Sequence, residues 1–93
     1  MINVESEDLD KILRVVKELS YEERKVLEYM IHNPSVGEII AIRELRSLYK
    51  IENPELVLAK LIELGLVERG LACYNLSRTL RKLIKERKLR LHW

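Results

Sequence analysis

The sequence of 93 residues has no phenylalanine, no glutamine, a single cysteine and a single threonine. A lone cysteine, Cys73, excludes an internal disulfide, and His32 and His92 have no partner at the spacing of a zinc site. No apolar run approaches the roughly 20 residues that cross a bilayer, and the first ten residues are acidic, unlike a secretory signal. We therefore expect a soluble, cytoplasmic protein with no membrane association, no metal ion and no other cofactor.

Glycine and histidine are also scarce, with three and two residues respectively. The chain contains no glycine-rich phosphate loop, nucleophile elbow or zinc-protease motif. We therefore expect a binding protein rather than an enzyme. What is abundant is charge, at 34% of residues, in a usage of Lys, Arg and Glu that resembles thermophilic proteins. The apolar residues suffice for one core, so residues 1–93 are expected to form a single domain.

Charge is distributed unevenly along the chain. Residues 1–76 contain ten basic and fourteen acidic residues, a net charge of −4. Residues 77–93 contain seven basic residues and one acidic residue, a net charge of +6. The overall charge of +2 therefore conceals an acidic body and a basic C-terminal segment.

Apolar spacing and capping residues predict four helices. The first, over residues 6–19, is capped by Ser6, and the second begins at a capping box formed by Ser20 and Glu23 and ends before Pro34. The third begins at Asn53-Pro54 and runs through Leu64, and the fourth begins after Ser77 and continues into the basic segment.

The remaining segments predict extended structure and one further helix. Residues 39–42 could form either a short buried strand or the start of a helix, and we expect an extended segment near 38–41 and a helix over about 42–50. Residues 66–69 and 72–76 read as two strands around a turn at Gly70-Leu71. Gly65 supplies the left-handed residue that closes the preceding helix.

This order of elements resembles the winged helix-turn-helix superfamily. The resemblance is closest over residues 20–76, where Leu45, Val57, Leu61 and the run from Leu64 to Glu68 match the superfamily's core pattern. It suggests a small, archaeal-type, DNA-binding-like protein with a mostly α fold and a short β-hairpin. The helix over 6–19 and the basic helix and tail over 77–93 would then be additions to the winged-helix core.

In DNA-binding members of that superfamily the second helix of the turn enters the major groove. By position this is the helix that starts at Asn53. Helical spacing places Val57, Leu61 and Leu64 inward and leaves an outward face made of Glu55, Leu56, Ala59, Lys60 and Glu63. The acidic residues of this face would repel phosphate, so we interpret it as a surface for a protein partner.

Basic residues in two other places are the candidates for binding nucleic acid without reading its sequence. One group lies on the helix over 42–50 and consists of Arg43, Arg46 and Lys50. The other belongs to the C-terminal segment and consists of Arg78, Arg81, Lys82, Lys85, Arg87, Lys88 and Arg90.

These residues leave three hypotheses for function. The first is a nucleic-acid-binding protein of transcription or replication that acts mainly through its basic C-terminal helix. The alternative is a protein-interaction accessory subunit of a larger nucleic-acid-processing complex, such as a DNA polymerase holoenzyme. The third is a homodimer formed through the apolar stripe of the N-terminal helix, which contains Leu9, Ile12, Leu13 and Val16.

Overall fold

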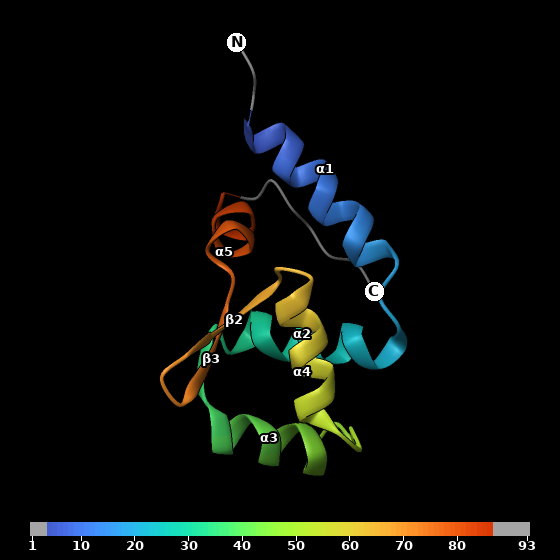
Figure 1. Ribbon diagram of the computed structural model, residues 1–93, viewed down its shortest axis with the longest axis vertical. Helices are drawn as coiled ribbons and strands as arrows, with labels where there is room; N and C mark the ends of the chain where they lie inside the picture. The colour runs from blue at the N-terminus through green and yellow to red at the C-terminus, as the bar shows by residue number, and fades with distance from the viewer. Residues whose placement is uncertain (1–3, 87–93) are drawn as a thin grey trace.

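The computed structural model describes residues 4–86. In this range the chain is mostly helical and has one small antiparallel sheet (Figure 1). The elements in chain order are α1 (Val4–Lys17), α2 (Tyr21–His32), β1 (Ser35–Gly37), α3 (Glu38–Ser47), α4 (Pro54–Glu63), β2 (Val67–Gly70), β3 (Cys73–Leu76) and α5 (Arg78–Lys85). The predicted fold class is confirmed, because this arrangement is compatible with a winged helix that carries an additional helix at each end.

The starts of α2, α4 and α5 lie where the capping residues predict them. At the start of α2 the Glu23 backbone N–H donates to Ser20 Oγ at 3.2 Å, and the Ser20 backbone N–H donates to Glu23 Oε1 at 2.9 Å. The side chains of Asn53 and Ser77 each accept a backbone N–H from the first turn of α4 and α5. These side-chain acceptors satisfy amide groups that have no partner inside their helix.

The extended segment lies earlier than expected. β1 occupies Ser35–Gly37 rather than residues 38–41, and it pairs antiparallel with β3, with Val36 opposite Tyr74. α3 begins directly afterwards at Glu38, whose backbone N–H donates to the carbonyl of Ala72 at 3.0 Å. The prediction was wrong because β1 is defined by its pairing with a strand almost forty residues away, which local sequence does not reveal.

The early start of α3 changes the environment of its first residues. Ile39 and Ile40 are exposed on the helix instead of buried in a strand. The helix also ends sooner than predicted, at Ser47, and Lys50 lies beyond it with a φ of 57°. Lys50 therefore does not continue the row of Arg43 and Arg46 along a helix.

The sheet has the order β1-β3-β2, so the hairpin strand β3 is central. In the hairpin Val67 is opposite Leu76 and Gly70 is opposite Cys73, which places the turn at Leu71-Ala72, one residue later than predicted. A Cβ at Gly70 would lie 2.7 Å from the Cys73 sulfur and 3.0 Å from the Asn75 amide nitrogen, so any other residue there would displace these side chains. The third strand, β1, was not predicted as a partner of the hairpin.

The core is built from every helix and from the sheet. Its buried apolar residues between residues 20 and 76 include Val26, Leu27, Met30, Ala41, Leu45, Ile51, Leu58, Leu61, Leu66, Val67, Tyr74 and Leu76. In α4 the fully buried side chains are Leu58 and Leu61, whereas Val57 and Leu64, predicted to point inward, are only half-buried. The buried row of α4 therefore passes through Leu58, which the prediction omitted.

Helices α1 and α5 lie at one end of the elongated molecule, with α3 at the other (Figure 1). Val16 of α1 and Leu80 and Leu83 of α5 are buried, and Leu9, Ile12 and Leu13 pack against the same core. The apolar stripe proposed for a homodimer is thus partly used within the chain. α1 begins at Val4, so Ser6 lies inside the helix and is not its N-cap. No helix in residues 4–86 has the length and apolar character needed to cross a membrane.

Candidate protein-binding surfaces

Helices α3 and α4 present exposed apolar side chains, and polar contacts to α2 and to the hairpin hold α3 in place. Tyr29 of α2 donates its hydroxyl hydrogen to Glu44 Oε1 of α3 at 2.6 Å. The Tyr29 ring also meets the Tyr49 ring edge to face, with centroids 5.6 Å apart. Burial, reinforced by the Glu44 carboxylate, raises the pKa of Tyr29 well above its ordinary value. This contact directs the Glu44 side chain of α3 toward α2.

The other acid of α3, Glu38, is held by the hairpin. Arg69 of β2 pairs with Glu38 at 2.6 Å, and its guanidinium lies over the Tyr74 ring, 5.7 Å from the centroid. Burial, followed by the nearby Glu38 carboxylate, raises the pKa of Tyr74. The basic residue beside the hairpin turn is therefore engaged within the protein, and the tip itself is the apolar Leu71, which is 98% exposed.

The first surface is a groove of about 370 Å³ between α4 and the start of α2. We call it the α2–α4 groove; its lining residues are Ser20, Glu22, Glu23, Leu56, Val57, Ala59, Lys60 and Glu63. Leu56 is 67% exposed over it. The carboxylate of Glu23 is engaged in the capping box, so Glu22 and Glu63 give the groove its acidic rim, opposed by Lys60.

The five residues predicted for a partner face are all exposed on α4. Four of them line the α2–α4 groove, and Glu55 is exposed without lining it. The prediction missed the wall that α2 contributes through Ser20 and Glu22. No local signal marks that wall, because it depends on how α2 and α4 pack together.

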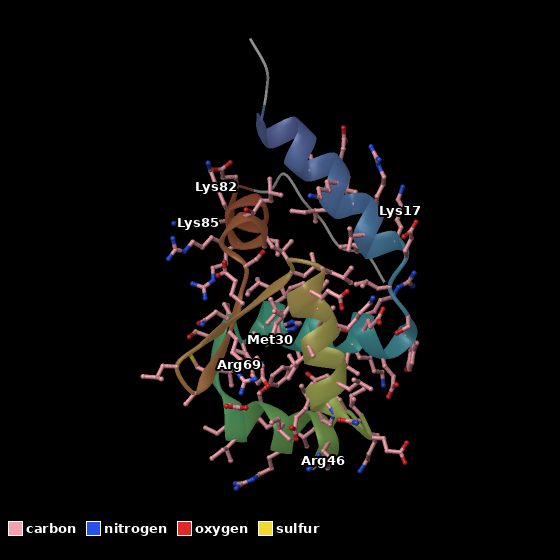
Figure 2. The ribbon with its side chains drawn as sticks, in the orientation of Figure 1. Lys17, Met30, Arg46, Arg69, Lys82 and Lys85 are labelled. Carbon is pink, nitrogen blue, oxygen red and sulfur yellow. The ribbon has the colours of Figure 1, made fainter. Side chains whose placement is uncertain are left out.

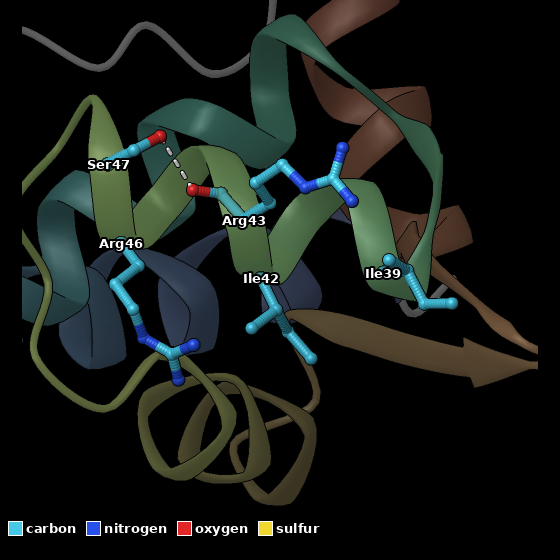
Figure 3. A pocket seen from close by; sticks show the side chains of 5 residues that line it. All are labelled: Ile39, Ile42, Arg43, Arg46 and Ser47. Carbon is cyan, nitrogen blue, oxygen red and sulfur yellow. Dashed lines mark hydrogen bonds between the residues drawn. The ribbon is translucent and has the colours of Figure 1, made fainter.

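The second surface is a groove of about 400 Å³ along α3. We call it the α3 face; it is lined by Ile39, Ile42, Arg43, Arg46 and Ser47, which share one side of the helix by their spacing. On this side of α3 the Arg43 side chain runs along the helix toward Ile39, whereas the Arg46 side chain points past the helix edge on the same side as Ile42 (Figure 3). The Ser47 hydroxyl donates to the Arg43 carbonyl at 2.7 Å. The two arginines were singled out from sequence. Ile39 was missed because an extended segment was expected over residues 38–41, and Ile42, expected at the start of the helix, was not assigned to a binding face.

The basic C-terminal segment is only partly described. Lys82 and Lys85 extend from the outer side of α5, far from Arg46 of α3 (Figure 2). Arg78 is exposed, and Arg81 donates to the carbonyl of Pro34 at 2.6 Å, so its guanidinium holds α5 against the end of α2. Three predicted nucleic-acid contacts lie outside the described residues: Arg87, Lys88 and Arg90.

Possible metal or redox sites are few. Within residues 4–86 no group of three or more His, Cys, Asp and Glu side chains could hold a metal ion. Cys73 is a half-buried free thiol, and the Asn75 amide donates to its sulfur at 3.5 Å.

A family model described as PolB1 Binding Protein 2 matches residues 20–82. The chain belongs to the PolB1 binding protein 2 family. The match starts at the capping box of α2 and ends inside α5, so it contains both the α2–α4 groove and the α3 face. It leaves out α1 and four of the seven C-terminal cations, Lys85, Arg87, Lys88 and Arg90. No curated protein matches the chain closely enough to add a named relative.

Proposed function

We propose that this protein is an accessory subunit that binds the polymerase PolB1, and that it acts as a binding module rather than as an enzyme. The observation that carries the proposal is the family match over residues 20–82, since the family is named for binding PolB1. This agrees with the hypothesis of an accessory subunit of a DNA polymerase holoenzyme. The nucleic-acid hypothesis has less support, because most of the basic tail lies beyond the matched residues.

The α2–α4 groove is the first place where we expect PolB1 to bind. An exposed leucine beside a groove is a suitable anchor, since burying such a side chain contributes about 1.5–3 kcal/mol. Leu56 occupies this position, and Ala59 beside it leaves room for a side chain of the partner. Because Glu22 and Glu63 are at the rim, the complementary segment of PolB1 would be apolar with basic neighbours.

We further infer that the fold is a winged helix-turn-helix in which α4, the helix that meets DNA in many members, contacts a protein instead. Its outward face carries Glu55 and Glu63 beside the exposed Leu56. Carboxylates placed against a phosphate backbone would oppose binding. The same carboxylates favour a basic protein surface, which supports the use of this helix in a protein complex.

The test is a direct binding measurement with purified PolB1 from the same organism. Isothermal titration calorimetry would compare the wild-type chain with Leu56→Asp and with Leu48→Asp. The control is well matched, because Leu48 is 69% exposed against 67% for Leu56 and lies outside both grooves. Circular dichroism would verify that each variant is folded.

We expect wild type to form a stoichiometric complex and Leu56→Asp to weaken it about 30-fold, the loss of an anchor worth about 2 kcal/mol. Leu48→Asp should bind like wild type. A wild-type chain that does not bind PolB1 would refute the proposed function. Wild-type affinity in Leu56→Asp would refute the placement of the contact in the α2–α4 groove.

A further inference from the structure

The α3 face combines two isoleucines with two arginines. Ile39 is 74% exposed, and Ile42 follows it one turn later on the same side of the helix. Arg43 lies beside this row and Arg46 lies beyond its Ile42 end, with the two guanidinium groups apart from each other (Figure 3). The exposed side chain of Ile39 contributes little to packing of the core. The α3 face therefore leaves apolar surface in contact with water.

The charges of the α3 face are not compensated within the described part of the chain. The two acids of α3 are engaged elsewhere, Glu38 with Arg69 and Glu44 with Tyr29. Among residues 4–86 neither Arg43 nor Arg46 forms an ion pair. The fold therefore directs carboxylates away from this side of α3 and leaves two guanidinium groups facing solvent.

This combination selects a class of ligand. Guanidinium groups bind carboxylates and phosphates equally well by paired hydrogen bonds. A nucleic-acid backbone, however, would cover Ile39 and Ile42 with charged and hydrated groups and would form no apolar contacts with them. A protein segment with an apolar side chain flanked by carboxylates satisfies both requirements, because the apolar side chain fills the groove of about 400 Å³ while each carboxylate meets one arginine.

We propose that the α3 face binds an acidic, apolar segment of PolB1, as a second contact in addition to the α2–α4 groove. This inference rests on the proposed function. The two surfaces have opposite charge, acidic at Glu22 and Glu63 and basic at Arg43 and Arg46. A partner that contacts both must present a basic segment to one and an acidic segment to the other. The pair of contacts therefore sets the orientation of the protein on PolB1 as well as adding affinity.

The decisive variant is Arg43→Glu combined with Arg46→Glu, titrated into PolB1 by calorimetry at low and at high salt. Its matched control is Arg78→Glu combined with Lys85→Glu, which makes the same change in net charge on the exposed side of α5, at the other end of the molecule. Ile39→Ser tests the apolar part of the face. Thermal unfolding of each variant confirms that the core is unchanged.

We expect the Arg43→Glu, Arg46→Glu variant to weaken PolB1 binding at least tenfold at low salt and to lose most of the salt dependence of the wild type. Ile39→Ser should weaken binding about threefold to tenfold, and the α5 control should stay within twofold of wild type. Arg43→Lys with Arg46→Lys, which keeps the charge but loses the paired hydrogen bonds, should be intermediate.

The inference is overturned if the Arg43→Glu, Arg46→Glu variant binds PolB1 like wild type while Leu56→Asp does not, an outcome that leaves the proposed function standing. It is also overturned if the double reversal removes binding to duplex DNA and leaves PolB1 binding intact, because the α3 face would then serve nucleic acid. Failure of the wild-type chain to bind PolB1 refutes the proposed function and this inference together.

Discussion

Leu56 and Leu58 are two residues apart on α4 and have opposite environments. Leu58 is fully buried against the core, and Leu56 is 67% exposed at the α2–α4 groove. Leu58→Ala removes a packed side chain and should lower the free energy of unfolding by about 2.7–5 kcal/mol, the range for leucines that leave a cavity. Leu56→Ala removes surface that already faces water, so its effect should stay within about 0.5 kcal/mol.

Urea denaturation followed by circular dichroism at 222 nm measures both values. In a chain of 93 residues each kcal/mol corresponds to about 4–8 °C in Tm, so Leu58→Ala should also unfold at a clearly lower temperature. Equal m-values in wild type and variants would show that all of them expose similar surface on unfolding, so their free energies of unfolding can be compared directly.

Equal destabilisation by the two substitutions would refute the orientation of α4. The face that carries Glu55, Leu56, Ala59, Lys60 and Glu63 would then be part of the core, and the α2–α4 groove could not bind a partner. If Leu56→Ala is as stable as wild type, a loss of PolB1 affinity in this variant can be attributed to the interface.

Three further variants test other features of the protein. Tyr29→Phe removes the hydrogen bond to Glu44 and should lower the free energy of unfolding by about 1.5–3 kcal/mol at pH 7. Because folding raises the pKa of Tyr29, its ionisation equilibrium contributes fully to the free energy of unfolding below about pH 10. Above that pH the contribution is lost by up to about 1.4 kcal/mol per pH unit. Between pH 10 and pH 11 the free energy of unfolding should therefore fall less in Tyr29→Phe than in wild type. Gly65→Ala places a side chain at a φ of 80° and should lower the free energy of unfolding by about 1 kcal/mol in a urea titration. If the basic segment binds nucleic acid, Arg78→Glu with Lys85→Glu should reduce the salt slope of duplex binding by about 2 in fluorescence anisotropy, and a wild type that binds no duplex at low salt would exclude that role.

The starts of α2, α4 and α5 could be predicted from sequence because their capping signals are local, whereas the starts of α1 and α3 were predicted too late. The Ser20–Glu23 capping box, the Asn53-Pro54 start and the Ser77 cap each act within a few residues, and the structure shows each contact directly. The outward face of α4 followed from helical spacing alone, and all of its five residues are exposed.

What could not be predicted depends on contacts between distant segments. β1 is a strand because Val36 pairs with Tyr74, so the start of α3 and the exposure of Ile39 were assigned incorrectly. Leu58 was missed because the contacts of α4 with α2 and β2 determine which row of its side chains is buried. Both candidate surfaces contain residues whose exposure depends on such distant contacts. Some of their residues could therefore be identified from sequence, whereas the grooves themselves could not.

The basic C-terminal segment is better tested by charge reversal than by truncation. Removing residues 78–93 would test its charge, but Leu80 and Leu83 within it are buried in the core. Truncation would therefore destabilise the whole protein and obscure any effect on binding. Charge reversal at exposed positions of α5 separates the two effects.

The proposed function requires this protein to bind PolB1 through the exposed face of α4. The most direct measurement is calorimetric titration of purified PolB1 with the wild-type chain, Leu56→Asp and Leu48→Asp. We expect a stoichiometric complex for wild type and Leu48→Asp, and an affinity about 30-fold lower for Leu56→Asp. A wild-type chain that gives no complex with PolB1 would contradict the proposed function.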